Sequence, residues 1–88
     1  MLRLWGKLIK DNKLISQVEY TYEYDDIEYQ DQLKLCITEI CREFDIQKPY
    51  WLNSNLREYN KYKKTSFRQD NFIEEVEFDI FEIEVLDE

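Results

Sequence analysis

Hydrophobic and polar residues alternate twice near the start of the chain, over residues 2–9 and again over residues 14–24. Alternation with a period of two is typical of half-buried β-strands. The polar run Lys10–Lys13 separates them, and its Asp11 and Asn12 suit a tight turn. The pattern therefore predicts an N-terminal β-hairpin. One face of its first strand carries Leu2, Leu4 and Leu8, and the other carries Arg3, Trp5, Lys7 and Ile9; in its second strand Ser16, Val18, Tyr20, Tyr22 and Tyr24 oppose Ile15, Gln17, Glu19, Thr21 and Glu23.

The apolar spacing then changes to steps of three and four, which predicts an amphipathic helix from about Ile27 to Phe44. Asp25 or Asp26 is expected to cap it, since Asp25 and Glu28 stand at capping-box spacing. The apolar stripe consists of Leu33, Cys36, Ile37, Ile40, Cys41 and Phe44.

The middle of the chain leaves two alternatives open. Pro49 disfavours helical backbone at Lys48 and begins an extended stretch. Residues 56–62, after the candidate cap Asn53-Ser54-Asn55, form either a short second helix or a loop pinned by its aromatic side chains. Residues 63–71 are expected to form an irregular loop.

The last element is predicted to be one long strand from Val76 to Val85. Its alternation slips by one residue, which predicts a β-bulge at Ile80–Phe81. The basic first strand separates like charges best when it lies between the two acidic strands. We therefore expect a single α+β domain over residues 1–88, with a three-stranded, mainly antiparallel sheet of order 2-1-3 and the helix on one face.

Composition narrows the function more than the fold. The chain has 12 Lys+Arg, 20 Asp+Glu and no His, for a net charge of −8. Without His it lacks the commonest general base and metal ligand. Cys36 and Cys41 diverge on the helix and are expected to stay reduced, which is typical of a cytosolic protein. No signal peptide or membrane span is apparent, and no metal or cofactor is expected.

Acidic residues concentrate at the end of the chain, where residues 69–88 carry a net charge of −9. The candidate acidic side chains are Glu77, Asp79, Glu82 and Glu84. They form either a solvated strand face that discourages edge aggregation or an acidic surface that attracts a basic partner.

A basic segment, residues 57–68, opposes them with a net charge of +4. Cations interleaved with aromatics are able to bind phosphates and stack bases. The alternative is that these cations pair with the acidic strands while the aromatic rings enter the core. The candidates here are Arg57, Tyr59, Lys61, Tyr62, Lys63, Lys64 and Arg68.

Three further aromatic side chains are candidates for partner contact. Tyr50 and Trp51 follow Pro49, and Trp5 lies on the polar face of the first strand. Trp and Tyr dominate binding hot spots, although they also close small cores. No serine has a neighbouring base and the sole glycine is Gly6, so no catalytic motif or phosphate loop is present. We expect a non-enzymatic, acidic module that binds another protein, such as an inhibitor of a nucleic-acid-handling protein; the alternative is a nucleic-acid binder that uses residues 57–68, which the net charge disfavours.

Four stretches together resemble a short, uncharacterised family of conserved hypothetical proteins of clostridial Firmicutes. They are Met1–Lys7, Glu43–Asp45, Lys48-Pro49 with Trp51-Leu52, and Phe67–Glu74. The resemblance implies a cytosolic bacterial protein and brings no known activity, cofactor or catalytic residue. Residues 18–24 and the acidic segment after them have no counterpart in it.

Overall fold

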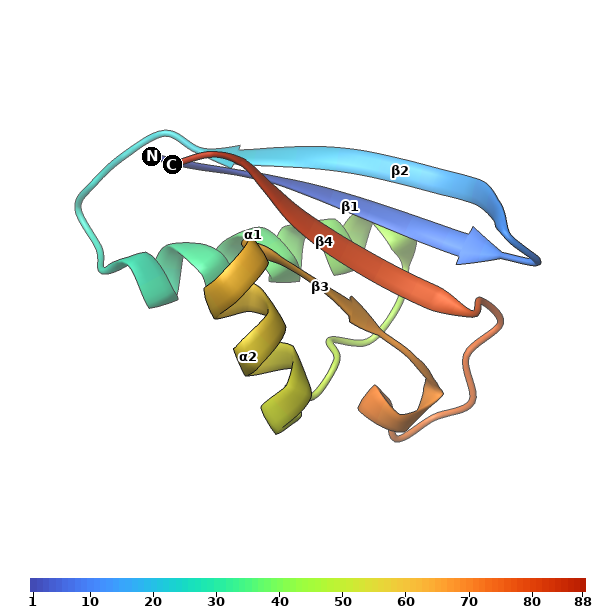
Figure 1. Cartoon of the computed structure of the whole chain (residues 1–88). Helices are drawn as coiled ribbons and strands as arrows, with labels where there is room; N and C mark the ends of the chain where they lie inside the picture. Colours follow the sequence, from blue (N-terminus) through green and yellow to red (C-terminus); the bar gives the residue numbers. More distant parts are fainter.

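The computed structural model describes the whole chain, Met1–Glu88, as a four-stranded antiparallel sheet with both helices against one face (Figure 1). The strand order is β2-β1-β4-β3. In chain order the elements are β1 (Leu2–Lys10), β2 (Lys13–Tyr22), α1 (Tyr29–Phe44), α2 (Asn53–Tyr62), β3 (Lys64–Phe67), the short 3-10 helix η1 (Gln69–Asn71) and β4 (Ile80–Asp87). Neither α-helix has the length and apolar character needed to cross a membrane.

The predicted hairpin is confirmed, and a two-residue turn joins β1 to β2. Asp11 and Asn12 in this turn have left-handed φ values of 52° and 63°. Two successive positive φ values match the twist of the flanking strands, and Asp and Asn tolerate them better than other side chains. The turn chemistry read from the sequence therefore fixes the hairpin register at Lys10–Lys13.

A β-bulge interrupts the hairpin at Ile15. Leu8 pairs with Ser16 whereas Ile9 pairs with Leu14, so Ile15 is the extra residue of β2. Simple alternation predicted Ile15 on the outer face with Gln17, and this was wrong. The side chain instead joins Leu8 in lining a hollow on the helix side of the sheet.

The core lies between α1 and the inner face of β1 and β4. Gly6 is central to it, because a Cβ atom there would lie 2.5 Å from Cγ2 of Ile40 and 3.4 Å from the rings of Phe44 and Phe81. The missing side chain lets α1 approach the sheet, and Ile40 is 1% exposed as a result. The helix stripe predicted from the sequence is the stripe that packs here.

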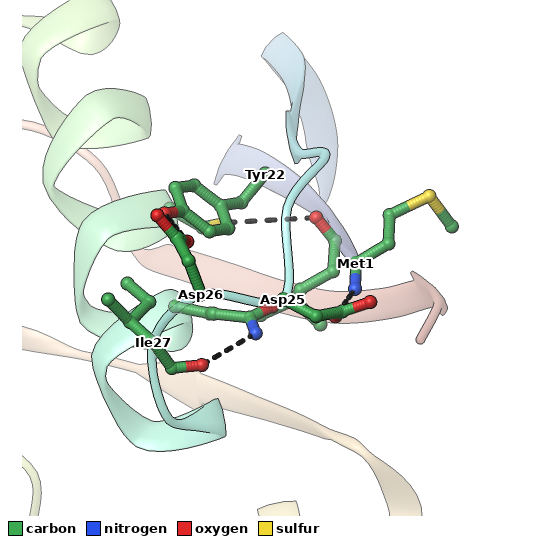
Figure 2. A network of polar contacts seen from close by, with 8 residues as sticks. Met1, Tyr22, Asp25, Asp26 and Ile27 are labelled. Carbon is green, nitrogen blue, oxygen red and sulfur yellow. Dashed lines mark hydrogen bonds and ion pairs between the residues drawn. The ribbon is translucent and has the colours of Figure 1, made fainter.

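α1 begins at Tyr29, two residues later than predicted, and neither aspartate caps it. Figure 2 shows why: Asp25 is bound by the N-terminal ammonium of Met1, and Asp26 accepts a 2.5 Å hydrogen bond from the Tyr22 hydroxyl. The ammonium lowers the pKa of Asp25, and the bond to Asp26 raises the pKa of Tyr22 to about 12. The N-cap position is Glu28, without a side-chain cap. Both carboxylates thus fasten the loop to β2 and the chain start.

Residues 53–62 form a helix, the first of the two alternatives, and buried amides attach it to β3. The Asn55 amide donates to the Thr65 hydroxyl at 2.8 Å and to the Ser66 carbonyl at 2.9 Å. Its oxygen accepts from Asn71 at 2.8 Å, and Asn71 also donates to the Tyr50 carbonyl. Buried polar groups are stable when paired in this way. This network holds residues 64–67, which were predicted to lie in a loop, as the additional strand β3.

The C-terminal strand differs from its prediction at its start. β4 begins at Ile80 rather than Val76, and its pairing with β1 is regular at Ile80 and Phe81, so the predicted bulge there was wrong. Phe78 is buried in the loop before β4, where the centre of its ring lies 5.5 Å from that of Phe72.

The predicted neighbours of β1 are confirmed, since β2 and β4 flank it. The three-stranded count was wrong, because β3 adds to the outer edge of β4. β3 has only four residues within a basic segment, Lys64–Phe67, too short for alternation to reveal it. Its inner residues Thr65 and Phe67 are buried.

We expect Gly6→Ala to lower the free energy of unfolding by about 1–3 kcal/mol, because the new methyl group meets Ile40 in a packed core. Ile40→Ala alone should lower it by about 2–5 kcal/mol. In the double variant the loss of unfolding free energy should be smaller than the sum of the two single losses, because alanine in place of Ile40 makes room for the methyl group. Urea unfolding of all four proteins measures this, and strict additivity would refute the close contact.

Candidate functional site

The outer face of the sheet carries a charge network that consumes part of the acidic strand. Lys7 on β1 lies 2.7 Å from Glu82 and 3.5 Å from Glu84 on β4. Burial alone would lower the pKa of Lys7, but the hydrogen bond and charge of Glu82, with Glu84, raise it. Two of the four predicted acidic candidates are thus paired within the fold.

The other two predicted carboxylates lie outside this network. Asp79 accepts a 2.8 Å hydrogen bond from the Asp11 N–H and so fastens the hairpin turn to the segment before β4. Glu77 has no ion-pair partner and lines a groove at the same end of the sheet. The predicted acidic surface is therefore divided among three different roles.

The basic segment does not neutralise the acidic one. Of its five cations only Lys63 forms an ion pair, with Glu88 at 3.9 Å. Its aromatics divide, since Tyr59 is 5% exposed whereas Tyr62 is 59% exposed. The cations without an ion pair are Arg57, Lys61, Lys64 and Arg68, all exposed.

The three candidate aromatic anchors lie in three different environments. Tyr50 is 57% exposed. Trp51 is partly buried, and its ring meets those of Tyr59 and Phe67 edge-on at 5.5 and 5.2 Å. Trp5 lies on the outer face, where its indole N–H donates to Gln17 and Lys7 stacks 4.0 Å above its ring. The structure does not bring them together into one surface.

One groove does gather uncompensated carboxylates. It lies between the end of α1, the bulge in β2 and the loop before β4, and has a volume of about 540 Å³. Four acidic side chains and one lysine line its rim: Asp45, Glu74, Glu75, Glu77 and Lys10. Its apolar lining consists of Leu8, Ile15, Phe44, Ile46, Val76 and Phe78. We call this site the acidic groove.

None of the four carboxylates has an ion-pair partner, and Asp45 adds a further source of negative potential. It is the C-cap of α1, in left-handed backbone with φ 55°. The C-terminus of a helix carries about half a negative charge from its carbonyl groups. A carboxylate there is unfavourable for stability, so the helix end strengthens the field that the groove presents.

Side-chain amides hold the acidic wall of the groove in place. Gln47 accepts a 3.1 Å hydrogen bond from the Glu74 N–H. Gln69 donates to the Glu74 carbonyl at 2.9 Å and accepts from the Val76 N–H at 3.0 Å. These bonds satisfy backbone groups, which leaves the carboxylates of Glu74, Glu75 and Glu77 free to meet a ligand.

Sequence reasoning identified Glu77 but missed Asp45, Glu74 and Glu75 as parts of one site. Asp45 lies far from the others in the chain and carries no local motif. The apolar Val76 and Phe78 were assigned to a strand, which placed Glu77 on a flat face. The one available signal was the run of acids at 74–79 without a cation.

The two cysteines are buried free thiols on α1. Burial raises the pKa of Cys36 to about 11, against a smaller opposing effect of the Tyr22 backbone. Burial likewise raises the pKa of Cys41 to about 12, opposed by the charge of Lys48. A nucleophilic cysteine needs the opposite shift. No three His, Cys, Asp or Glu side chains are arranged to hold a metal ion.

We therefore expect Ellman's reagent to react with Cys36 and Cys41 only through opening of the fold. Because their pKa is raised above the unfolded value of about 8.5, their contribution to stability is complete below that pH. It should decline as the pH rises from about 8.5 toward 11. Cys36→Ala/Cys41→Ala should flatten this alkaline decline in urea titrations, whereas fast labelling of the folded wild type would contradict the burial.

Comparison with protein-family models, curated proteins and solved structures finds no match to this chain. The resemblance to a clostridial family noted from the sequence therefore stays a prediction.

Proposed function

We propose that this protein is a non-enzymatic protein-binding module whose acidic groove holds a basic, partly apolar segment of another protein. The observation that carries the proposal is the set of four carboxylates without cation partners around an apolar lining. The net charge of −8 supports it, because a negative field draws a basic partner toward the surface.

Each part of the groove has a separate task in this proposal. The apolar lining, which includes Phe44 and Val76, buries aliphatic side chains of the partner and supplies affinity that salt does not screen. The carboxylates select Lys or Arg at the flanking positions and raise the association rate. Asp45 places a carboxylate at a helix end that is itself negative, which adds to the attraction for a cation.

Basic segments of this kind are typical of proteins that bind nucleic acid, whose cations otherwise meet phosphates. An acidic groove that occupies such a segment would compete with nucleic acid, so an inhibitor of a nucleic-acid-handling protein is the role we favour. A cytosolic location fits the two free cysteines.

Direct nucleic-acid binding by residues 57–68 has less support. Tyr59 and Phe67 belong to the core, which removes two of the three rings available for stacking on bases. The free cations remain, but they lie in a molecule with a large negative charge.

The first test uses a short fluorescein-labelled peptide of leucine and lysine residues, titrated with the protein at low and at physiological salt. Fluorescence anisotropy should show saturable binding to the wild type. Glu74→Lys/Glu77→Lys should weaken binding about tenfold or more, because it reverses the charge of the acidic wall. Glu23→Lys/Asp87→Lys changes the net charge equally at exposed positions away from the groove and should weaken it far less.

Equal losses in the two double variants would overturn the proposal, because they would show attraction to net charge alone. The proposal would also be overturned if the wild type bound a labelled single-stranded oligonucleotide tightly and Lys61→Glu/Lys64→Glu abolished that binding.

The second test separates stability from binding at Asp45. Asp45→Asn keeps the left-handed cap but removes the charge. It should therefore raise the free energy of unfolding by about 0.3–1 kcal/mol and weaken binding of the leucine-lysine peptide. Asp31→Asn is the matched control at the opposite end of α1, where a carboxylate is favourable; it should lower stability and leave binding unchanged. Urea unfolding and anisotropy measure both, and an Asp45→Asn variant that binds the peptide like wild type would contradict the role of Asp45.

A further inference from the structure

A second groove lies between α1 and α2, nearer the start of α1 than the acidic groove. It has a volume of about 500 Å³. Six apolar or aromatic side chains line it: Tyr29, Leu33, Ile37, Trp51, Leu56 and Tyr59. We call it the aromatic groove.

Its two walls are regular helices. Tyr29, Leu33 and Ile37 follow one stripe of α1 at steps of four, and Leu56 and Tyr59 face them from α2, with Lys63 at its C-cap. The α1 wall therefore spans about two helical turns, roughly 11 Å. A groove of this length between two helices matches the apolar stripe of a short amphipathic helix.

The charge of this groove is opposite to that of the molecule. Its charged lining residues are Lys34 and Lys63, and no carboxylate is among them. Lys34 has no ion pair. The Lys63 ammonium lies 5.3 Å from the centre of the Tyr29 ring and 5.6 Å from that of Tyr59, with Glu88 3.9 Å away. One cation thus stands on each wall.

A pair of tyrosines joins the two walls of the groove. The hydroxyls of Tyr29 and Tyr59 lie 2.6 Å apart, so one donates a hydrogen bond to the other. Trp51 is fixed by edge-on contacts to Tyr59 and Phe67, so its ring forms part of a rigid wall. Leu56 by contrast is 49% exposed. The site is built but leaves one apolar side chain open.

We propose that the aromatic groove binds an amphipathic helix of a partner protein whose apolar stripe is flanked by Glu or Asp. The apolar stripe would cover Leu56 and Leu33. The flanking carboxylates would meet Lys34, which has no ion pair, and would compete with Glu88 for Lys63. Helix-in-groove recognition uses this combination of anchors and charges. A second copy of this chain does not offer α1 as such a helix, because the apolar stripe of α1 is buried against the sheet.

This inference goes beyond the proposed function, because the two grooves differ in lining residues and in the charge of their partners. The acidic groove holds a basic segment at the end of α1, and the aromatic groove holds an acidic helix near its start. The protein would then bridge two partners of opposite charge.

The test uses a short peptide with leucines at helical spacing and glutamates elsewhere, and a matched peptide with lysine in place of each glutamate. Trp5→Phe leaves Trp51 as the only tryptophan, so its emission reports this groove. The glutamate peptide should shift that emission saturably and gain helical circular dichroism. Leu56→Asp should weaken binding of the glutamate peptide about tenfold or more. Lys34→Glu should weaken binding of the glutamate peptide and strengthen binding of the lysine peptide.

Tyr62→Asp is the matched control, since Tyr62 is exposed on the same helix but does not line the groove. Binding of the glutamate peptide should survive it, and should also survive Glu74→Lys/Glu77→Lys, which tests the acidic groove separately. Absence of binding, equal loss in Leu56→Asp and Tyr62→Asp, or loss in Glu74→Lys/Glu77→Lys would each overturn the inference. Self-association in analytical ultracentrifugation that Leu56→Asp abolishes would also overturn it, because the occupant would then be a second copy.

Discussion

The structure depends on the close approach of α1 to β1 at Gly6. Ile40 occupies the space that a side chain at Gly6 would fill, and Phe44 and Phe81 close around it. Because α1 covers this inner face, the charged residues of β1 are directed to the outer one. Lys7 therefore meets Glu82 and Glu84 there, which joins β1 to β4 by side chains as well as by backbone.

This pairing decides which charges remain available. The acids of β4 are partly neutralised by a lysine from the first strand, whereas the basic segment 57–68 contributes one ion pair, from Lys63 to the terminal residue. The two charge blocks of the sequence thus lie side by side at β3 and β4 but share only one ion pair. Uncompensated carboxylates gather in the acidic groove, and uncompensated cations lie along α2 and β3.

Periodicity predicted the hairpin, α1 and the C-terminal strand, because each depends on a long local pattern of burial, and the charges of the strands predicted that β4 lies beside β1. It failed where burial is set by distant contacts. Thr65 and Phe67 are buried through Asn55 and β4, and four residues are too few to show a period. Phe78 packs against Phe72 in the loop before β4 and does not lie in a strand.

The acidic groove shows the same limit for a site. Glu77 was recognised from the acidic run, but Asp45 enters the groove only because α1 ends beside the loop before β4. Ile15 enters only because the bulge turns it inward, a shift of one residue that alternation reads as the opposite face. None of these residues belongs to a recognisable sequence motif, and only the topology of the fold brings them together in one groove.

The two grooves lie toward opposite ends of α1 in a molecule 37 Å long. At physiological ionic strength exposed charges are screened over about 8 Å. The field of the acidic groove is therefore weaker at Lys34 and Lys63 than in the groove itself, so the aromatic groove can favour carboxylates although the whole molecule is acidic. The basic segment itself lies beside the acidic strand, because β3 pairs with β4 and Lys64 stands opposite Glu84. The ion pairs of Glu82 and Glu84 nevertheless come from Lys7 on β1, so the cations of residues 57–68 other than Lys63 have no ion pair, and the two grooves differ in charge.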